Sequence, residues 1–332
     1  MSWGMEKKDL RIVFMGTPEF AEFCLRRLVG EGFDIVGVVT MPDKPIGRHG
    51  SVLQASPVKK CALEYGIPVL QPERLKDEAF LSELRALDAQ LQIVVAFRML
   101  PESVWNMPPM GTFNLHASLL PQYRGAAPIN WAIINGDRET GVTTFFLKHD
   151  IDTGDIIHQE RTPILDSDNA GTLHDRLMEI GASLVCRTAY DIIDGNVSPI
   201  SQQSANDGGL RPAPKIFKET CELHFDRPVI DIHNLVRGLS PYPAAHATIC
   251  SESNDSIDLK IYASEIESCE PSESIGTVVT DNKKYLKIAL KDGYLHLTMV
   301  QQAGKKAMPI ADFLRGQHLD GIWKIVPYPV LN

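Results

Sequence analysis

The chain has 332 residues, of which 44% are hydrophobic and 23% are charged, and its formal net charge is −9. This length and composition predict a globular protein with two domains and exclude a surface that is basic overall. No stretch approaches the ~18 apolar residues that a membrane-spanning helix needs. The N-terminus is short and polar, unlike a signal or transit peptide, so we expect a cytoplasmic monomer with no membrane partner.

The first elements predict a βαβ unit. Arg11–Met15 and Asp34–Thr40 have the composition of strands, and between them Thr17 suits an N-cap and Pro18 the first helical position. A single glycine, Gly16, does not make the Gly-x-Gly-x-x-Gly fingerprint of dinucleotide binding. We therefore expect a Rossmann-like parallel sheet, and the fold alone does not imply a dinucleotide cofactor.

The next segment, Pro42–Gly50, has too many turn residues for a helix or strand and predicts a loop. Lys44 and Arg48 lie in it, and the ordinary interpretation of such residues is a solvated surface loop. A helix through Tyr65 follows. Further along, Asp77–Leu87 has a helical pattern, and Leu91–Phe97 is a nearly continuous apolar run, typical of a central strand that is buried on both faces.

A polar pair then appears on the next predicted strand, Thr112–His116. Its residues alternate, so the side chains of Asn114 and His116 point to the same face. Pro121 and Gly125 break the chain into a tight loop directly afterwards, which places the pair at a strand end. Open α/β sheets carry their sites at strand ends, so an amide donor and an imidazole share a candidate active-site patch.

The remaining elements of this domain are predicted from their periodicity. We expect a short helix at Pro128–Asn135, strands at Gly141–Lys148 and Ile156–Thr162, and a long helix that Thr172 caps and that runs to Ile193. The α/β domain is therefore expected over residues 1–197. Residues 198–214, rich in Ser, Gln, Asn, Gly and Pro, are predicted to be a linker.

Residues 215–332 predict a second domain, a small OB-like β-barrel, because short strand patterns recur at regular spacing with few helices. The strands are expected at Cys221–Phe225, Ala247–Ile249, Leu259–Tyr262, Gly276–Val279, Tyr285–Ala289 and Tyr294–Gln301, with a helix at Ile230–Leu239. Its 13 Lys and Arg against 15 Asp and Glu exclude a uniformly basic face. A local basic patch remains, formed by Lys283, Lys284, Lys287, Lys291, Lys305 and Lys306.

Three strings in this order resemble the formyltransferase family that uses 10-formyltetrahydrofolate. They are Asn114-x-His-x-Ser-Leu-Leu-Pro121, Tyr123-Arg-Gly-Ala-Ala-Pro128 and Asp150-x-Asp-Thr-Gly-Asp155. Each residue alone would be a turn, cap or core residue, and it is their joint spacing that carries the resemblance. The resemblance implies that Asn114, His116 and Asp152 are catalytic and that the folate is bound by Ser118, Leu119, Leu120 and Pro121.

Two further strings resemble the members of this family that act on methionyl-tRNA. They are Pro42-Asp-Lys-Pro45 with Gly47-Arg48, and Gln302-Ala-Gly-Lys-Lys-Ala-Met308. The resemblance implies that Lys44 and Arg48 contact the acceptor end of the tRNA. It implies transfer of the formyl group from 10-formyltetrahydrofolate to the α-amino group of initiator methionyl-tRNA, which serves translation initiation and requires no metal.

Alternatives stay open at this point. The same catalytic string would serve an enzyme that formylates a nucleotide-sugar amine, and a nucleic-acid-binding module could carry it as a vestige, although all three polar residues are retained. Ala96–Pro101 resembles the family segment that lines the folate pocket, and Arg98 within it is expected either to contact a folate carboxylate or to be solvated. The six scattered cysteines and the histidines show no zinc-binding or disulfide spacing.

Overall fold

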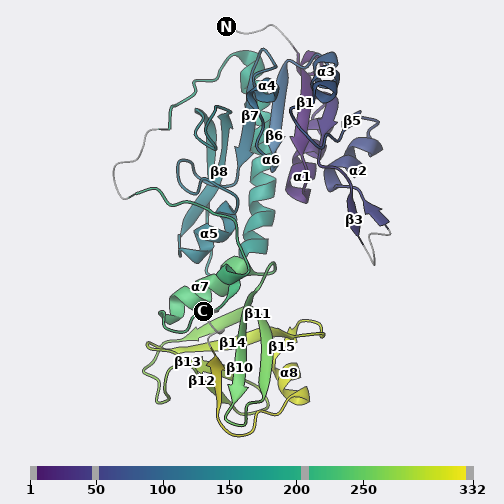
Figure 1. Ribbon diagram of the computed structural model, residues 1–332. Coiled ribbons are helices and arrows are strands. Elements are labelled where there is room, and N and C mark those ends of the chain that lie inside the picture. The colour runs from purple at the N-terminus through teal and green to yellow at the C-terminus, as the bar shows by residue number, and fades with distance from the viewer. Residues whose placement is uncertain (1–5, 47–51, 203–208, 327–332) are drawn as a thin grey trace. The chain divides into compact units, whose positions relative to one another are not determined.

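A computed structural model of the chain describes residues 6–46, 52–202 and 209–326 (Figure 1). It consists of two compact units that alternate along the sequence. Unit 1 comprises Met1–Gly125, Thr140–Thr162 and Asp175–Pro212, and unit 2 comprises Ala126–Glu139, Pro163–His174 and Ala213–Asn332. The domain limits expected at residues 197 and 215 stay a prediction.

Unit 1 is built on a seven-stranded sheet in the order β5-β2-β1-β6-β7-β8-β9. The first five strands of that order pair in parallel, and β8 runs antiparallel to β7. Its strands are β1 (Arg11–Gly16), β2 (Asp34–Val39), β5 (Val69–Leu70), β6 (Leu91–Val95), β7 (Thr112–His116), β8 (Glu139–Phe146) and β9 (Ile156–Pro163). The Rossmann-like parallel sheet predicted from the sequence is therefore confirmed.

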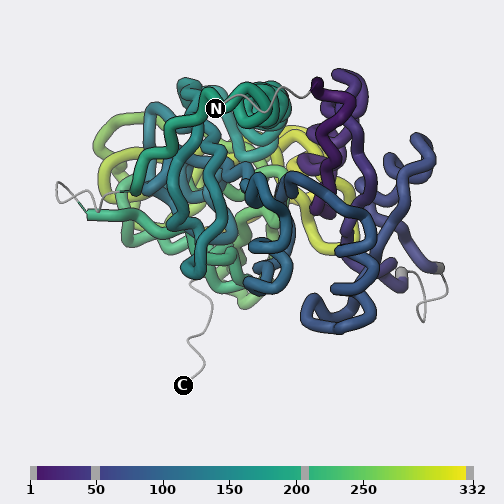
Figure 2. Tube along the Cα trace, turned by 90° about the horizontal axis from the view of Figure 1, so that it is seen from above, coloured from purple at the N-terminus to yellow at the C-terminus, as the bar shows by residue number. Residues whose placement is uncertain are grey.

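Helices cover both faces of this sheet. They are η1 (Lys7–Asp9), α1 (Glu19–Gly30), α2 (Pro57–Glu64), α3 (Glu78–Ala86), α4 (Glu102–Trp105) and α6 (Ala170–Asp194), whereas α5 (Pro128–Ile134) belongs to unit 2. Apolar side chains of α3 and α4 pack on the face that Val13, Met15 and Val94 present. On the opposite face α6, seen nearly end-on as the teal coil in Figure 2, lies so close that a Cβ at Gly181 would be 2.8 Å from Cδ2 of Leu115.

Two helix starts differ from the expectation. Pro18, not Thr17, is the N-cap of α1, and no side chain caps that helix because the Thr17 hydroxyl is buried without a hydrogen-bond partner among the described residues. In α6 the reciprocal bonds run between Asn169 and Thr172, each backbone N–H donating to the other side chain. Asn169 therefore caps the helix, and Thr172 lies in its first turn.

The loop predicted at Pro42–Gly50 contains a strand that the turn residues concealed. Lys44–Ile46 (β3) pairs antiparallel with Val52–Gln54 (β4), and this ribbon stands apart from the main sheet (Figure 1). Pro45 is tolerated because a two-stranded ribbon has free edges, where a missing N–H breaks no ladder bond. The prediction of a simple loop is wrong for Lys44–Ile46, and Arg48 lies outside the described residues.

Unit 2 contains the predicted antiparallel barrel. Six strands close in the order β11-β10-β16-β12-β13-β14, because β14 pairs back onto β11, and β15 adds to β14. The strands are β10 (Ala245–Ser251), β11 (Ser256–Glu267), β12 (Thr277–Thr280), β13 (Leu286–Ala289), β14 (Tyr294–Gln302), β15 (Met308–Pro309) and β16 (Trp323–Val326). The small β-barrel expected from the sequence is confirmed.

Four features of the barrel unit depart from the prediction. Cys221–Phe225 is not a strand, since a 3-10 turn, η3 (Glu219–Cys221), occupies its start and Glu222 makes only a single bridge to His246. The strands β15 and β16 and the helix α8 (Ile310–Gly316) had no counterpart in the prediction, whereas α7 (Val229–Leu239) did. Across both units, no helix in the described residues is long and apolar enough to span a membrane.

Candidate active site

The end of β7 presents two polar side chains on one face. Asn114 pairs with Val94 of β6 and Phe145 of β8, and His116 pairs with Thr143. Leu115 between them points to the opposite face, against α6, so the alternation predicted for this strand holds. Within the described residues, the Asn114 side chain forms no hydrogen bond, which leaves its amide available to a ligand.

The geometry around His116 fixes its tautomer. Its Nε2 atom lies 2.8 Å from the carbonyl oxygen of Tyr123. A carbonyl oxygen only accepts hydrogen bonds, so Nε2 carries a hydrogen and Nδ1 is the nitrogen that gains or loses a proton. The Nδ1 atom lies 3.9 Å from Oδ2 of Asp152, and both side chains are largely buried, with exposed fractions of 7% and 13%. The structure thus brings His116 and Asp152 together, and their catalytic roles stay a prediction.

Asp152 lies in a tight turn between β8 and β9. Its φ of 54° is in the left-handed region, which residues other than glycine seldom adopt, although Asp and Asn do so more often than most. The backbone N–H of Gly125 donates to its Oδ2 atom at 3.1 Å. Gly154, two residues on, cannot be replaced without shifting this turn, because a Cβ there would be 1.6 Å from the carbonyl oxygen of Phe146.

Two residues that the sequence analysis missed border Asp152. The Gln202 side-chain amide donates to the carbonyl oxygens of Asp152 and Gly154, at 2.9 and 2.8 Å. The guanidinium of Arg124 donates in turn to Oε1 of Gln202, at 2.6 and 3.2 Å. Arg124 lies within the string Tyr123–Pro128 quoted above. Gln202 lies in the segment predicted as a linker, and the polar composition of that segment gives no sign that one of its residues contacts Asp152.

The four residues expected to bind folate form the loop after β7. Ser118 and Leu120 are buried, and their backbone is already engaged, since Ser118 O accepts from Thr143 Oγ1 and Leu120 N donates to the same atom. Leu119 and Pro121 are partly exposed. If this loop meets a ligand, the contact therefore falls chiefly on Leu119 and Pro121.

A hollow of about 510 Å³ lies where the segment after β6 passes residues 75 and 76. It is lined by Leu75, Lys76, Arg98, Met99, Leu100, Pro101, Glu102 and Ser103. The Arg98 guanidinium donates to the carbonyl oxygens of Pro72 and Glu73, so it holds the loop after β5 and is not simply solvated; a contact with a folate carboxylate stays a prediction. Burial lowers the pKa of Arg98.

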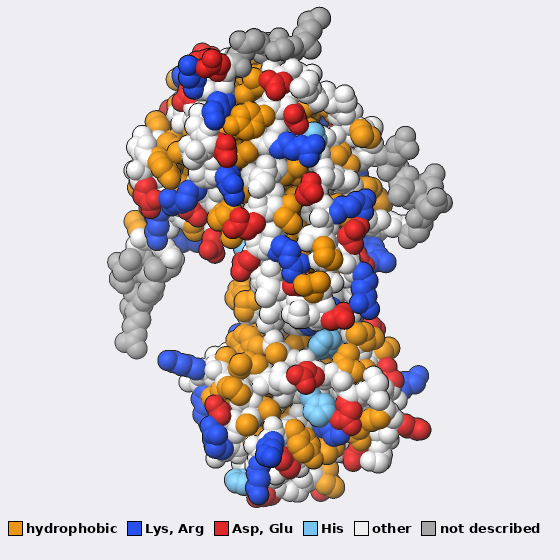
Figure 3. Space-filling view, turned by 180° about the vertical axis from the view of Figure 1, so that it is seen from behind, with side chains coloured by type: hydrophobic (Ala, Val, Ile, Leu, Met, Phe, Trp, Pro, Cys, Tyr) orange, Lys and Arg blue, Asp and Glu red, His pale blue; other side chains and the backbone are white. Residues whose placement is uncertain are grey.

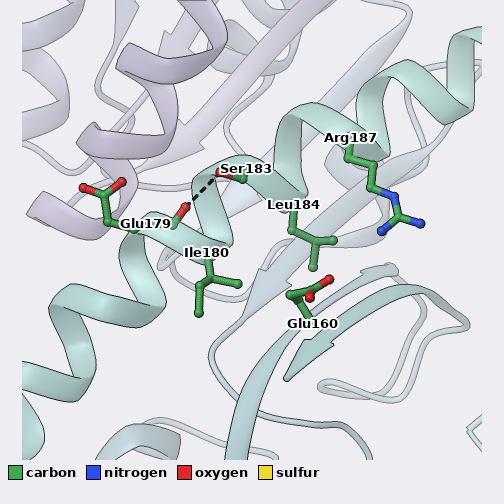
Figure 4. Close-up of a pocket in the computed structure, with 6 residues that line it drawn as sticks. All are labelled: Glu160, Glu179, Ile180, Ser183, Leu184 and Arg187. Carbon is green, nitrogen blue, oxygen red and sulfur yellow. Dashed lines mark hydrogen bonds between the residues drawn. The ribbon is translucent and has the colours of Figure 1, made fainter. Parts of the chain in front are cut away.

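A second hollow, of about 380 Å³, lies between β9 and α6 (Figure 4). Glu160 projects into it from β9, and α6 contributes Glu179, Ser183 and Arg187 among others. The Ser183 hydroxyl donates a hydrogen bond to the carbonyl oxygen of Glu179, at 3.1 Å. Neither hollow is lined by Asn114, His116 or Asp152.

The β3–β4 ribbon is clamped at its base. Nζ of Lys59 lies 2.7 Å from Oδ2 of Asp43 and 2.7 Å from Oε1 of Gln71, and the Gln71 amide donates to the other oxygen of Asp43. The hydrogen bonds from Lys59 and Gln71 lower the pKa of the Asp43 carboxyl. Lys44 begins the ribbon and is exposed to solvent.

The lysines of the barrel unit are not all available to a ligand. Nζ of Lys287 lies 2.8 Å from Oε2 of Glu267 and 3.8 Å from the centre of the Tyr294 ring. Lys287 therefore belongs to an internal ion pair, while Lys283, Lys284, Lys291, Lys305 and Lys306 are exposed. On the face shown in Figure 3, basic and acidic side chains are mixed, in agreement with the charge count.

Residues 10–188 match the family described as formyl transferase, and residues 215–318 match the formyl transferase C-terminal domain. The chain belongs to the formyl transferase family. The resemblance recognised in the catalytic strings is thereby confirmed. The two matches flank the predicted linker.

Similar proteins with a closely related sequence include methionyl-tRNA formyltransferases. The chain is 61% identical over 314 residues to the methionyl-tRNA formyltransferase of Parabacteroides distasonis, covering 94% of this chain and 97% of that one. It is 56% identical to the methionyl-tRNA formyltransferase of Bacteroides thetaiotaomicron, over 97% of this chain and 100% of that one. At this identity the chain groups with the methionyl-tRNA formyltransferases within the family.

Solved structures agree in fold at much lower identity. The sugar 3N-formyl transferase WlaRD, in the presence of dTDP and 5-N-formyl-THF, gives a TM-score of 0.62 at 22% identity, over 90% of this chain and 99% of that one. The N-formyltransferase of Helicobacter canadensis, in complex with folinic acid and dTDP-3-aminofucose, gives 0.62 at 19% identity, over 90% and 100%. At these identities the likeness shows the fold alone.

Proposed function

We propose that this protein transfers the formyl group of 10-formyltetrahydrofolate to the α-amino group of methionyl-tRNA. The observation that carries the proposal is the buried His116–Asp152 pair beside an unengaged Asn114 amide, in a formyl transferase whose relatives at 54–61% identity are methionyl-tRNA formyltransferases. The folate donor is supported by the family and by the folate compounds named with the solved structures of similar fold.

The reaction joins an amine to a formyl carbon and releases the folate nitrogen. When the neutral amine attacks, negative charge develops on the formyl oxygen. The Asn114 amide can donate to that oxygen, and the Nδ1–H of protonated His116 can donate more strongly, because charge-assisted hydrogen bonds are stronger. Nδ1 is the available nitrogen of the ring, since Nε2 is held by the Tyr123 carbonyl.

Two protons must move for the reaction to balance. The attacking amine loses one, and the departing folate nitrogen gains one. Oδ2 of Asp152 can take the first, directly or through a water, and Nδ1 of His116 can supply the second. The 3.9 Å between these atoms exceeds a hydrogen bond, so neither is locked to the other before substrate arrives.

The binding of the two substrates follows from the surrounding elements. We assign the folate to the Ser118–Pro121 loop, with Leu119 and Pro121 as its accessible side chains. We assign the acceptor end of the tRNA to Lys44 and Arg48 on and beyond the β3 strand, because a protein with a net charge of −9 must attract phosphate locally. No group of three or more metal-binding side chains was found among the described residues.

The runner-up acceptor, a nucleotide-linked amino sugar, gives the sharpest test. Purified protein is supplied with 10-formyltetrahydrofolate and either methionyl-tRNA or a dTDP-linked amino sugar, and kcat/KM is measured for each acceptor. We expect formylmethionyl-tRNA and no formylated sugar. Formylation of the sugar with the tRNA left unchanged would replace the proposal by its runner-up, and transfer to neither would favour a binding module.

A further inference from the structure

We propose that Gln202 and Arg124 are positioning residues that hold Asp152 in register with His116. Gln202 belongs to the segment after α6, which we call the strap and define as Ile200–Gln202 and Gly209–Pro212. The proposal rests on the proposed function, since it assigns a role in that reaction. Under this proposal, part of the segment predicted as a linker helps to position the catalytic side chains.

Contacts from other residues must stabilise the backbone conformation of Asp152, because its φ value is unfavourable for a residue other than glycine. At a φ of 54° a residue other than glycine has a backbone cost, which the contacts around it must offset. The Gln202 amide uses both of its N–H groups on this turn, one on the carbonyl of Asp152 and one on that of Gly154. These two bonds fix the Asp152–Thr153 and Gly154–Asp155 peptide units.

Gln202 is itself fixed in orientation. Its Oε1 atom accepts two N–H groups from the Arg124 guanidinium, a planar fork that defines which end of the amide faces the turn. Arg124 directly precedes Gly125, whose N–H donates to Oδ2 of Asp152. The carboxylate and the backbone of Asp152 are therefore held by one connected network.

The strap also supports the partner of Asp152. The carbonyl oxygen of Arg211 accepts from the N–H of Tyr123 at 2.7 Å, and the Tyr123 carbonyl holds Nε2 of His116. The strap is anchored to the sheet by Ile200, which exchanges two backbone hydrogen bonds of 2.8 Å with Ile156. Both members of the His116–Asp152 pair are thus placed by the same segment, which favours positioning over a merely structural contact.

The test removes the amide donors and measures formyl transfer to methionyl-tRNA. Gln202→Met keeps the length of the side chain without its hydrogen bonds, and Gln202→Glu keeps an acceptor for Arg124 but removes both donors to the turn. We expect kcat to fall about 10- to 100-fold in each variant, with KM for both substrates within about twofold of wild type. Ser201→Ala, at the exposed neighbouring position, should match wild type.

The decisive arm repeats Gln202→Met in an Asp152→Ala background. A residue that acts only by placing Asp152 has nothing left to place there, so the second substitution should lower kcat by less than about twofold. Full additivity, or wild-type kcat in the single variants, would overturn the proposal. Thermal unfolding of each full-length variant reports folding separately, and absence of transfer by the wild type would refute the proposed function instead.

Discussion

At the scale of single residues, the site is defined by what each polar group can still bind. Nε2 of His116 is hydrogen-bonded to a backbone carbonyl, and Oδ2 of Asp152 accepts one hydrogen bond from the N–H of Gly125. Asn114 has no recorded partner in the described part of the chain. The three groups are therefore left with one unengaged amide, one ring nitrogen and one carboxylate face, which are the donors and the acceptor that formyl transfer needs.

The first prediction concerns the Asn114 amide. Removing one donor to a developing oxyanion typically costs about 2.7 to 4 kcal/mol, so Asn114→Ala should lower kcat by roughly 100- to 1,000-fold with the folate KM largely unchanged. Because Asn114 and Asp152 serve one transition state, the double alanine variant should lose far less than the product of the two single losses. Steady-state kinetics of the three variants would decide this, and near wild-type turnover in Asn114→Ala would remove the residue from the mechanism.

At the scale of elements, the β3–β4 ribbon is held at its base by Lys59 of α2. The second prediction is that Lys59→Met, which breaks the contacts to Asp43 and Gln71, raises the KM for methionyl-tRNA several-fold and leaves the folate KM unchanged. The reason is that a loosely held ribbon loses entropy when it binds. Lys60→Met, an exposed neighbour on the same helix, is the matched control. Equal increases in both KM values would mean that Lys59 supports the fold as a whole.

The packing of α7 on the barrel gives a pH dependence. Burial, with a smaller contribution from Arg237, lowers the pKa of His233 from 6.5 to about 4, and its Nδ1 lies 2.9 Å from the Ser264 hydroxyl. The unfolded chain binds the proton more readily than the folded one between these values. The stability contributed by neutral His233 is therefore complete above pH 6.5 and is lost as the pH falls toward 4.

The third prediction follows from that sign. Between pH 7 and pH 5 the wild type should lose about 2 kcal/mol of unfolding free energy that His233→Gln does not lose. Urea unfolding at several pH values measures this, with His224→Gln at an exposed position as the control. An identical pH dependence in wild type and His233→Gln would show that the proton on His233 is not linked to folding.

The same scale shows which elements a sequence can predict. The long apolar periodicity of α6 and the nearly continuous apolar run of β6 were enough to predict them, because burial dictates both patterns. β3 was missed because its pairing with β4 is a property of two segments, and Pro45 argues locally against a strand. The strap contacts were beyond reach for the same reason, since Gln202 meets Asp152 across 50 positions and Arg124 across 78.

At the scale of the whole molecule, an α/β unit carries the candidate chemistry, and a barrel unit carries exposed lysines that lie among acidic residues. Net charge does not attract the tRNA, so attraction is assigned to local groups such as Lys44 and Arg48. In this proposal Lys44 and Arg48 serve the binding of the tRNA, whereas His116 and Asp152 serve only the chemical step at its amine. Binding and chemistry should therefore be separable by mutation.

The most direct measurement is a single-turnover experiment with excess enzyme, methionyl-tRNA and 10-formyltetrahydrofolate that carries an isotope label in the formyl carbon. Wild-type protein should place the label on the α-amino group of the methionine. His116→Ala should do so at least about 100-fold more slowly while still binding methionyl-tRNA with unchanged affinity. Absence of label on the methionine with the wild type, or equal rate constants for the two proteins, would contradict the account.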